Sequence, residues 1–142
     1  MVSKLTRDIQ MDLLNLLDWS ISIMYERFSS TKIYPKILLL DKHRKERSIK
    51  AFDYNEQKML VTEMHRCFAS FIKQLKKYCP SLTKMERMIC CLSLRFPPLT
   101  VSLCFGNYNT NCIKTHKNRI KKKMLELSDF KFLFDFIFSP PC

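Results

Sequence analysis

The chain has 142 residues, a formal net charge of +12 and 46% hydrophobic residues, which argues against disorder and fits one compact domain or two small ones. Its single glycine excludes the glycine-rich phosphate loops of common nucleotide-binding enzymes. No run approaches the roughly 20 apolar residues of a membrane span, and Asp8, Asp12 and Asp18 interrupt any signal peptide. Seven cysteines, an odd number, indicate reduced and mostly buried thiols. We therefore expect an all-α, cytoplasmic protein without membrane contact.

Residues 4–28 are predicted to form an amphipathic helix, because apolar residues recur there at steps of three and four. The Tyr34–Pro35 pair should end helical structure. The apolar run over 37–40 fits a strand or a helical turn, and the charged stretch over 41–50 fits a solvated helix face or a linker. We expect residues 1–50 to form a helical dimerisation region with a charged linker. Its apolar stripe consists of Leu5, Ile9, Leu13, Leu16, Leu17, Ile21, Met24 and Phe28, with Trp19 as a further core or dimer-interface residue.

Two capping boxes mark helix starts further along the chain, in Asp53 with Glu56 and in Thr83 with Glu86. The first helix is expected to continue for about six turns, up to the proline at position 80. The second is expected to end before the prolines at positions 97 and 98. The inward residues of the second helix are expected to be Met85, Ile89, Cys90 and Leu92.

A short helix is expected over 99–105, with Gly106 as the residue that follows its C-terminal cap. Asn109 is expected to cap a long last helix. The tail over 130–138 has phenylalanine at every second position and fits a strand or a packed helix. These elements make residues 51–142 the second region of the chain. The buried stripe of its last long helix is Ile113, Ile120, Met124 and Leu127.

The last long helix is strongly basic, with six positive and no acidic residues between positions 114 and 123. A helix that buries one stripe and exposes a cationic face favours an anionic partner, because its charges otherwise repel one another. Lys114, Lys117, Asn118 and Lys121 are expected on one face, opposite the buried stripe. A solvated lysine-rich helix without a partner is the alternative interpretation.

Residues 52–127 resemble the LuxR/GerE-type helix-turn-helix domain, in the variant found in bacteroidete regulators. Leu82, Thr83 and Glu86 match the opening Leu-Thr-x-x-Glu of that family. Residues 112–116 (Cys-Ile-Lys-Thr-His) match its recognition-helix motif Thr-Val-Lys-x-His at the same distance from the opening. Residues 99–102 (Leu-Thr-Val-Ser) stand where the family usually has Lys-Glu-Ile-Ala, shifted by one position.

The resemblance implies a transcription regulator that binds double-stranded DNA as a homodimer, with no catalysis, no cofactor, no metal and no small-molecule ligand. Its last long helix would lie in the major groove, supported by the helix over 83–94 and by the short helix over 99–105. The expected base contacts are Asn111, Lys114, Thr115 and Asn118. The expected phosphate contacts are Lys117, Arg119, Lys121 and Lys122.

Two other functions fit the same residues. One is a degenerate helix-turn-helix that acts as a protein-interaction adaptor, and the other is an RNA-binding module that uses the basic helix. A zinc site is not expected, because the cysteines and His65 are scattered over positions that fit the core pattern. An enzyme with a Cys–His pair is not expected either, because the resemblance gives His116 a structural or backbone-contact role.

Overall fold

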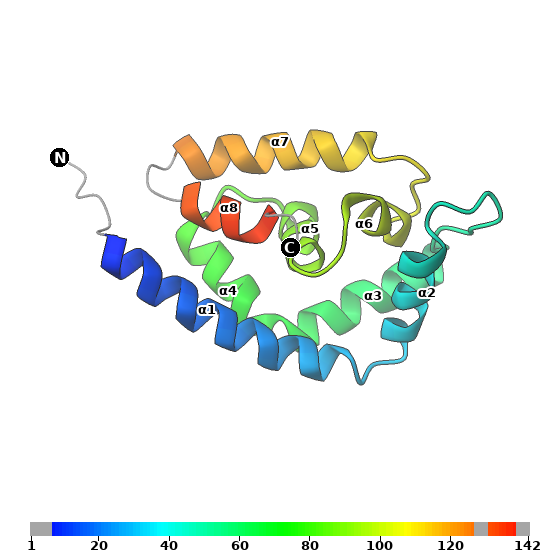
Figure 1. Ribbon diagram of the computed structural model, residues 1–142, viewed down its shortest axis with the longest axis horizontal. Coiled ribbons are helices and arrows are strands. Elements are labelled where there is room, and N and C mark those ends of the chain that lie inside the picture. The colour runs from blue at the N-terminus through cyan, green and yellow to red at the C-terminus, as the bar shows by residue number, and fades with distance from the viewer. Residues whose placement is uncertain (1–6, 127–130, 139–142) are drawn as a thin grey trace.

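The computed structural model describes residues 7–126 and 131–138, and each regular element in these ranges is an α-helix (Figure 1). The predicted all-α fold is therefore confirmed. The helices are α1 (Arg7–Phe28), α2 (Ile33–His43), α3 (Tyr54–Cys67), α4 (Ala69–Tyr78), α5 (Lys84–Ser93), α6 (Pro98–Cys104), α7 (Asn111–Glu126) and α8 (Lys131–Phe138).

One hydrophobic core runs through all of these helices. The short helix α5 lies in the middle and contacts α3, α4, α6, α7 and α8. Below it, α1 packs along α3 and α4, and α2 packs on α3 and α6, whereas α7 forms the upper edge of the molecule (Figure 1). The core is continuous between residues 1–50 and residues 51–142, since Phe28 and Ile33 belong to the same buried cluster as Phe68 and Ile89.

The apolar stripe of α1 is covered by the chain's own helices over its second half. Leu17, Ile21, Met24 and Phe28 are buried, as expected. The expectation is wrong for Leu16, which is 57% exposed, and Trp19 is 66% exposed and is not part of the core. Leu13 is half-buried, Leu5 lies outside the described residues, and the side chain of Ile9 lies outside the described side chains.

The expected break at Tyr34–Pro35 is wrong, because both residues lie in the first turn of α2. A proline is tolerated there, since the N–H groups of the first turn have no partner within the helix. The run over 37–40 is helical, with Ile37 and Leu40 buried, and not a strand. The charged stretch over 41–50 forms the end of α2 and the loop that follows it.

The helix expected to run unbroken from Asp53 to the proline at position 80 is two helices, divided at Phe68. The start is confirmed, since the Glu56 N–H donates to Asp53 Oδ1 at 2.8 Å and the Asp53 N–H donates to Glu56 Oε1 at 3.1 Å. The ring of Phe68 is fully buried between those of Tyr25 and Phe28, at centroid distances of 4.9 and 5.1 Å. The apolar pattern therefore continues through a point where the backbone leaves the helical conformation.

The capping box at Thr83 is also confirmed, and α5 follows it. Ile89, Cys90 and Leu92 are buried as expected, but Met85 is 41% exposed, so its expected inward position is wrong. Glu86 takes the buried position in this first turn, with only 1% of its surface exposed.

The tail over 131–138 forms the helix α8, which packs on α7, α5 and α1. Its buried residues Leu133, Phe134 and Ile137 are spaced as on one face of a helix, so the strand alternative is wrong for this segment. Phe130 lies outside the described residues. Five free cysteines of the described chain are buried and Cys112 is exposed.

Candidate nucleic-acid interface

The basic helix α7 is held from behind by two short helices. α5, α6 and α7 each contact the other two, and the expected stripe of Ile113, Ile120 and Met124 is buried against them. Leu127, expected in the same stripe, lies outside the described residues. Val101 and Ser102 of α6, which stand at the small and apolar positions of the motif, are both fully buried. This packing leaves the opposite side of α7 open along the upper edge of the molecule (Figure 1).

The connection between α6 and α7 is fixed by hydrogen bonds and by the single glycine. Gly106 has a φ of 83°, its N–H donates to Leu103 O at 3.1 Å, and the Asn107 N–H donates to Ser102 O at 3.0 Å. These two bonds form a Schellman motif, so the predicted place of Gly106 after the helix cap is confirmed. Asn109 Oδ1 accepts the Asn111 N–H at 3.0 Å, which satisfies the start of α7.

A buried ion pair anchors the other end of α7 to α5. Lys123 Nζ lies 2.6 Å from Glu86 Oε1, which also accepts the Thr83 N–H at 2.8 Å. Burial by itself raises the pKa of Glu86, but the hydrogen bonds from Lys123 and Thr83 outweigh it, so the pKa lies below its ordinary value. Lys123 is therefore occupied inside the protein, and one of the six cations of the basic helix is not available to an external partner.

The outward face of α7 carries a line of polar side chains. Asn111, Thr115, Asn118 and Lys122 follow one another at steps of three and four and are exposed. Lys114 and Arg119 are exposed on the two sides of this line.

The hydrogen-bonding capacity of this line is mostly unused. The Thr115 hydroxyl donates to Asn111 O at 3.0 Å, so its oxygen remains free to accept. Within residues 7–126 and 131–138, the side-chain amides of Asn111 and Asn118 have no protein partner. Among the cations, Lys122 makes only a solvent-exposed contact of 4.0 Å with Glu126.

The expectation that Lys114, Lys117, Asn118 and Lys121 share one face is wrong for Lys117 and Lys121. The Lys117 ammonium lies 5.4 Å from the ring centre of Phe138, and the Lys121 ammonium lies 5.9 Å from that of Phe134. Both lysines therefore lean over the rings of α8, beside the outward face and not on it. The sequence gave no position for α8, which is why this division of the cations was missed.

Other candidate chemistry finds little support in the described residues. In those ranges no group of three His, Cys, Asp or Glu side chains is placed to hold a metal ion. Of the helices described, none combines the length and the apolar character needed to cross a bilayer. His116 is half-buried on α7, and its Nδ1 has no hydrogen-bond partner.

Comparison with protein-family models, with curated proteins and with solved structures finds no match to this chain. The resemblance to the LuxR/GerE-type domain therefore depends on the matched residues alone.

Proposed function

We propose that this chain is a DNA-binding transcription regulator that inserts α7 into the major groove of double-stranded DNA. The observation that carries the proposal is the outward face of α7, where Asn111, Thr115 and Asn118 form a polar line between exposed cations. A carboxamide can donate and accept at once, which suits the paired acceptor and donor of adenine in the major groove. The matched motifs at positions 82–86 and 112–116 support a helix-turn-helix of the LuxR/GerE type built from α5, α6 and α7.

In this proposal the cations of α7 have different tasks. Lys114, Arg119 and Lys122 surround the polar line and contact phosphates on both sides of the groove, with Lys114 also near base edges. Lys117 and Lys121 contribute at the edge of the interface, since their ammonium groups lie over the rings of α8. Lys123 contributes no contact, because Glu86 holds it.

The proposal is tested with the double variant Lys114→Ala/Lys122→Ala and a fluorescent duplex of about 30 base pairs, or three helical turns. Fluorescence anisotropy over a range of salt concentrations gives the slope of log affinity against log salt. Each lost phosphate contact removes about 0.9 from this slope, so we expect a decrease of about 1.8. The matched control is Lys73→Ala/Lys76→Ala on the exposed side of α4, which removes the same charge and should leave the slope unchanged.

Selection of duplex sequences in vitro then tests base reading. We expect the wild-type chain to enrich a defined sequence and Asn118→Ala to lose preference at one position, because a bidentate amide contact contributes about 1–3 kcal/mol of discrimination. An absence of duplex binding at low salt would contradict the proposal and favour the adaptor. Tighter binding to single-stranded RNA than to duplex DNA would favour the RNA-binding alternative.

We further propose that the chain binds DNA as a homodimer, since one recognition helix reads few base pairs. The surface available for this is the exposed pair Leu16 and Trp19 on α1, because the rest of the apolar stripe is buried in the chain's own core.

A further inference from the structure

A second cationic surface lies in the loop between α2 and α3. The stretch over 41–50 contains two acidic side chains, and both are already paired within the loop. Asp41 lies 3.5 Å from Arg44, and Glu46 lies 2.8 Å from His43. Four further cations are exposed and make no ion pair with the described residues; they are Lys42, Lys45, Arg47 and Lys50. We call these four residues the basic loop.

The basic loop is tied to the α6–α7 connection by three hydrogen bonds from the residues that flank it. Before the loop, Asp41 Oδ1 accepts the Thr100 hydroxyl of α6 at 2.6 Å. After the loop, the Phe52 N–H donates to Leu103 O at 2.9 Å, and the Ala51 N–H donates to Tyr108 Oη at 3.2 Å.

These contacts join the segment to the turn that leads into α7. Gly106, in the middle of that turn, lies so close that an added Cβ would be 3.5 Å from Phe52 O. The basic loop therefore projects beside the beginning of α7, at the same end of the molecule (Figure 1).

We infer that the basic loop is a second DNA-contacting element, which binds backbone phosphates beside the groove that α7 occupies. This inference rests on the proposed function. Because the flanking residues are hydrogen-bonded to α6 and to the α6–α7 turn, a duplex that receives the start of α7 brings its phosphates to the same end of the molecule. Cations without internal partners repel one another, and phosphates relieve this repulsion and release counterions. The loop adds affinity without sequence preference, because phosphate contacts carry no base information.

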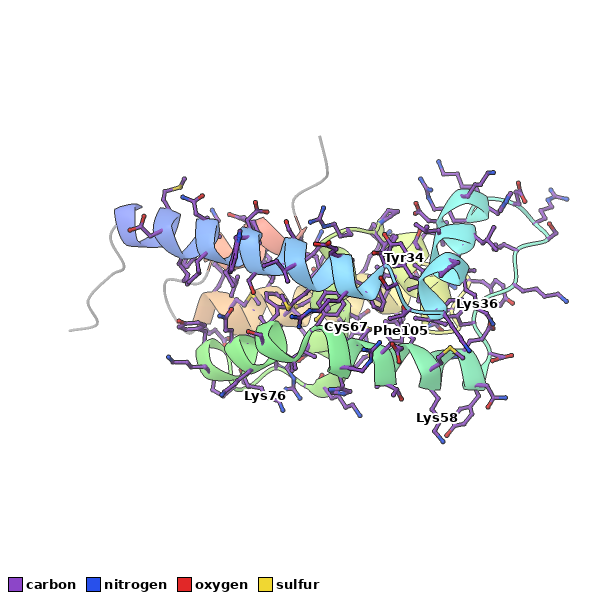
Figure 2. All side chains as sticks on the ribbon, turned by 90° about the horizontal axis from the view of Figure 1, so that it is seen from below. Tyr34, Lys36, Lys58, Cys67, Lys76 and Phe105 are labelled. Atoms are coloured by element: carbon purple, nitrogen blue, oxygen red, sulfur yellow. The ribbon has the colours of Figure 1, made fainter. Side chains whose placement is uncertain are left out.

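The test uses the full chain and a quadruple variant of the basic loop, Lys42→Ala/Lys45→Ala/Arg47→Ala/Lys50→Ala. A matched variant removes four exposed lysines from α3 and α4, Lys58→Ala/Lys73→Ala/Lys76→Ala/Lys77→Ala. Figure 2 shows Lys58 and Lys76 at the outer edge of these two helices, away from the basic loop. Both variants are checked by circular dichroism and thermal melting. Anisotropy titrations with a duplex of about 30 base pairs, three helical turns, then give the salt slope of each.

We expect the loop variant to lose about 1.8–3.6 from the slope, which corresponds to two to four phosphate contacts, and the matched variant to keep the wild-type slope. In selected sequences, the loop variant should enrich the same bases as the wild type. If the wild type binds duplex DNA and the loop variant keeps its slope, the loop inference is wrong and the proposed function stands. If the wild type binds no duplex at all, both are wrong. A loop variant that loses binding to single-stranded RNA or to anionic vesicles, but not to duplex DNA, also overturns the inference.

Discussion

At the scale of single residues, Glu86 combines two tasks that are usually separate. Its carboxylate closes the capping box at the start of α5 and also binds Lys123 on α7, so one side chain both begins a helix and positions another. With 2% of its side chain exposed, Glu86 depends on these partners to remain charged. The sequence motif predicts the first task and says nothing of the second.

The ion pair predicts a pH dependence of stability. The pKa of Glu86 in the folded chain lies below its ordinary value of 4.5, so protonation favours the unfolded state. The stabilisation by Glu86 is complete above about pH 5 and is lost as the pH falls through the folded-state pKa. Urea denaturation should therefore show that the wild type loses more stability between pH 7 and pH 3.5 than Glu86→Gln does.

The glutamine variant keeps a hydrogen-bond acceptor for the Thr83 N–H and removes only the charge. At pH 7 we expect it to lower the free energy of unfolding by about 1–3 kcal/mol, the range for losing a charged hydrogen-bond partner. Equal pH dependence in the two proteins would contradict the assigned role of the pair.

Gly106 makes a second prediction at this scale. Its φ of 83° is unfavourable for other residues, and an added Cβ would lie 2.8 Å from Gln57 Nε2, which donates to Phe52 O. Gly106→Ala should lower the free energy of unfolding by about 1–2 kcal/mol in chemical denaturation, the range for a left-handed backbone with a Cβ. Repeating the substitution in a Gln57→Ala background removes the steric part, so the loss should become smaller. An unchanged stability of Gly106→Ala would mean that the α6–α7 turn has another conformation.

At the scale of helices, the starts were predictable because capping is local. The boxes at Asp53 and Thr83 use side chains three residues apart, and both are present as the pattern predicts. The break at Phe68 was not predictable, because apolar spacing reports burial and not backbone continuity. Phe68 stays in the core while the chain changes direction around the rings of Tyr25 and Phe28.

The candidate interface shows the same limit. The buried stripe of α7 follows from its periodicity, and so does the existence of an opposite polar face. The separation of Lys117 and Lys121 from that face depends on Phe134 and Phe138 of α8, which are distant in sequence. The anchoring of the basic loop depends on pairs such as Asp41 and Thr100, which are 59 positions apart. No local pattern marks such contacts.

At the scale of the whole molecule, the +12 charge and one exposed apolar surface act in opposite directions on self-association. The second half of the α1 stripe is buried, which removes the original reason for a partner at Leu17, Ile21 and Phe28. The first turns of α1 project beyond α4 in both views (Figures 1 and 2) and place Leu16 and Trp19 on an open surface. A second copy of α1 is a covering of matching shape, because the two surfaces would be identical in a twofold dimer.

This arrangement predicts that the chain dimerises through α1 once salt screens its charge. At about 0.15 M salt the screening length is about 8 Å, so repulsion between two cationic chains is short-ranged. Light scattering at micromolar concentration should give twice the 17.0 kDa mass of the chain. Leu16→Ser/Trp19→Ser should return the mass to 17.0 kDa, because it removes the exposed apolar contact without touching the core.

The matched control is Leu38→Ser/Leu39→Ser on α2, where two leucines are 45% and 58% exposed. If dimerisation depends on α1 and not on general exposure of apolar side chains, this variant keeps the dimer mass. A wild-type mass of 17.0 kDa would contradict the dimer, and the chain would then bind DNA as a monomer. A dimer that survives Leu16→Ser/Trp19→Ser but not the α2 variant would move the interface to α2, next to the basic loop.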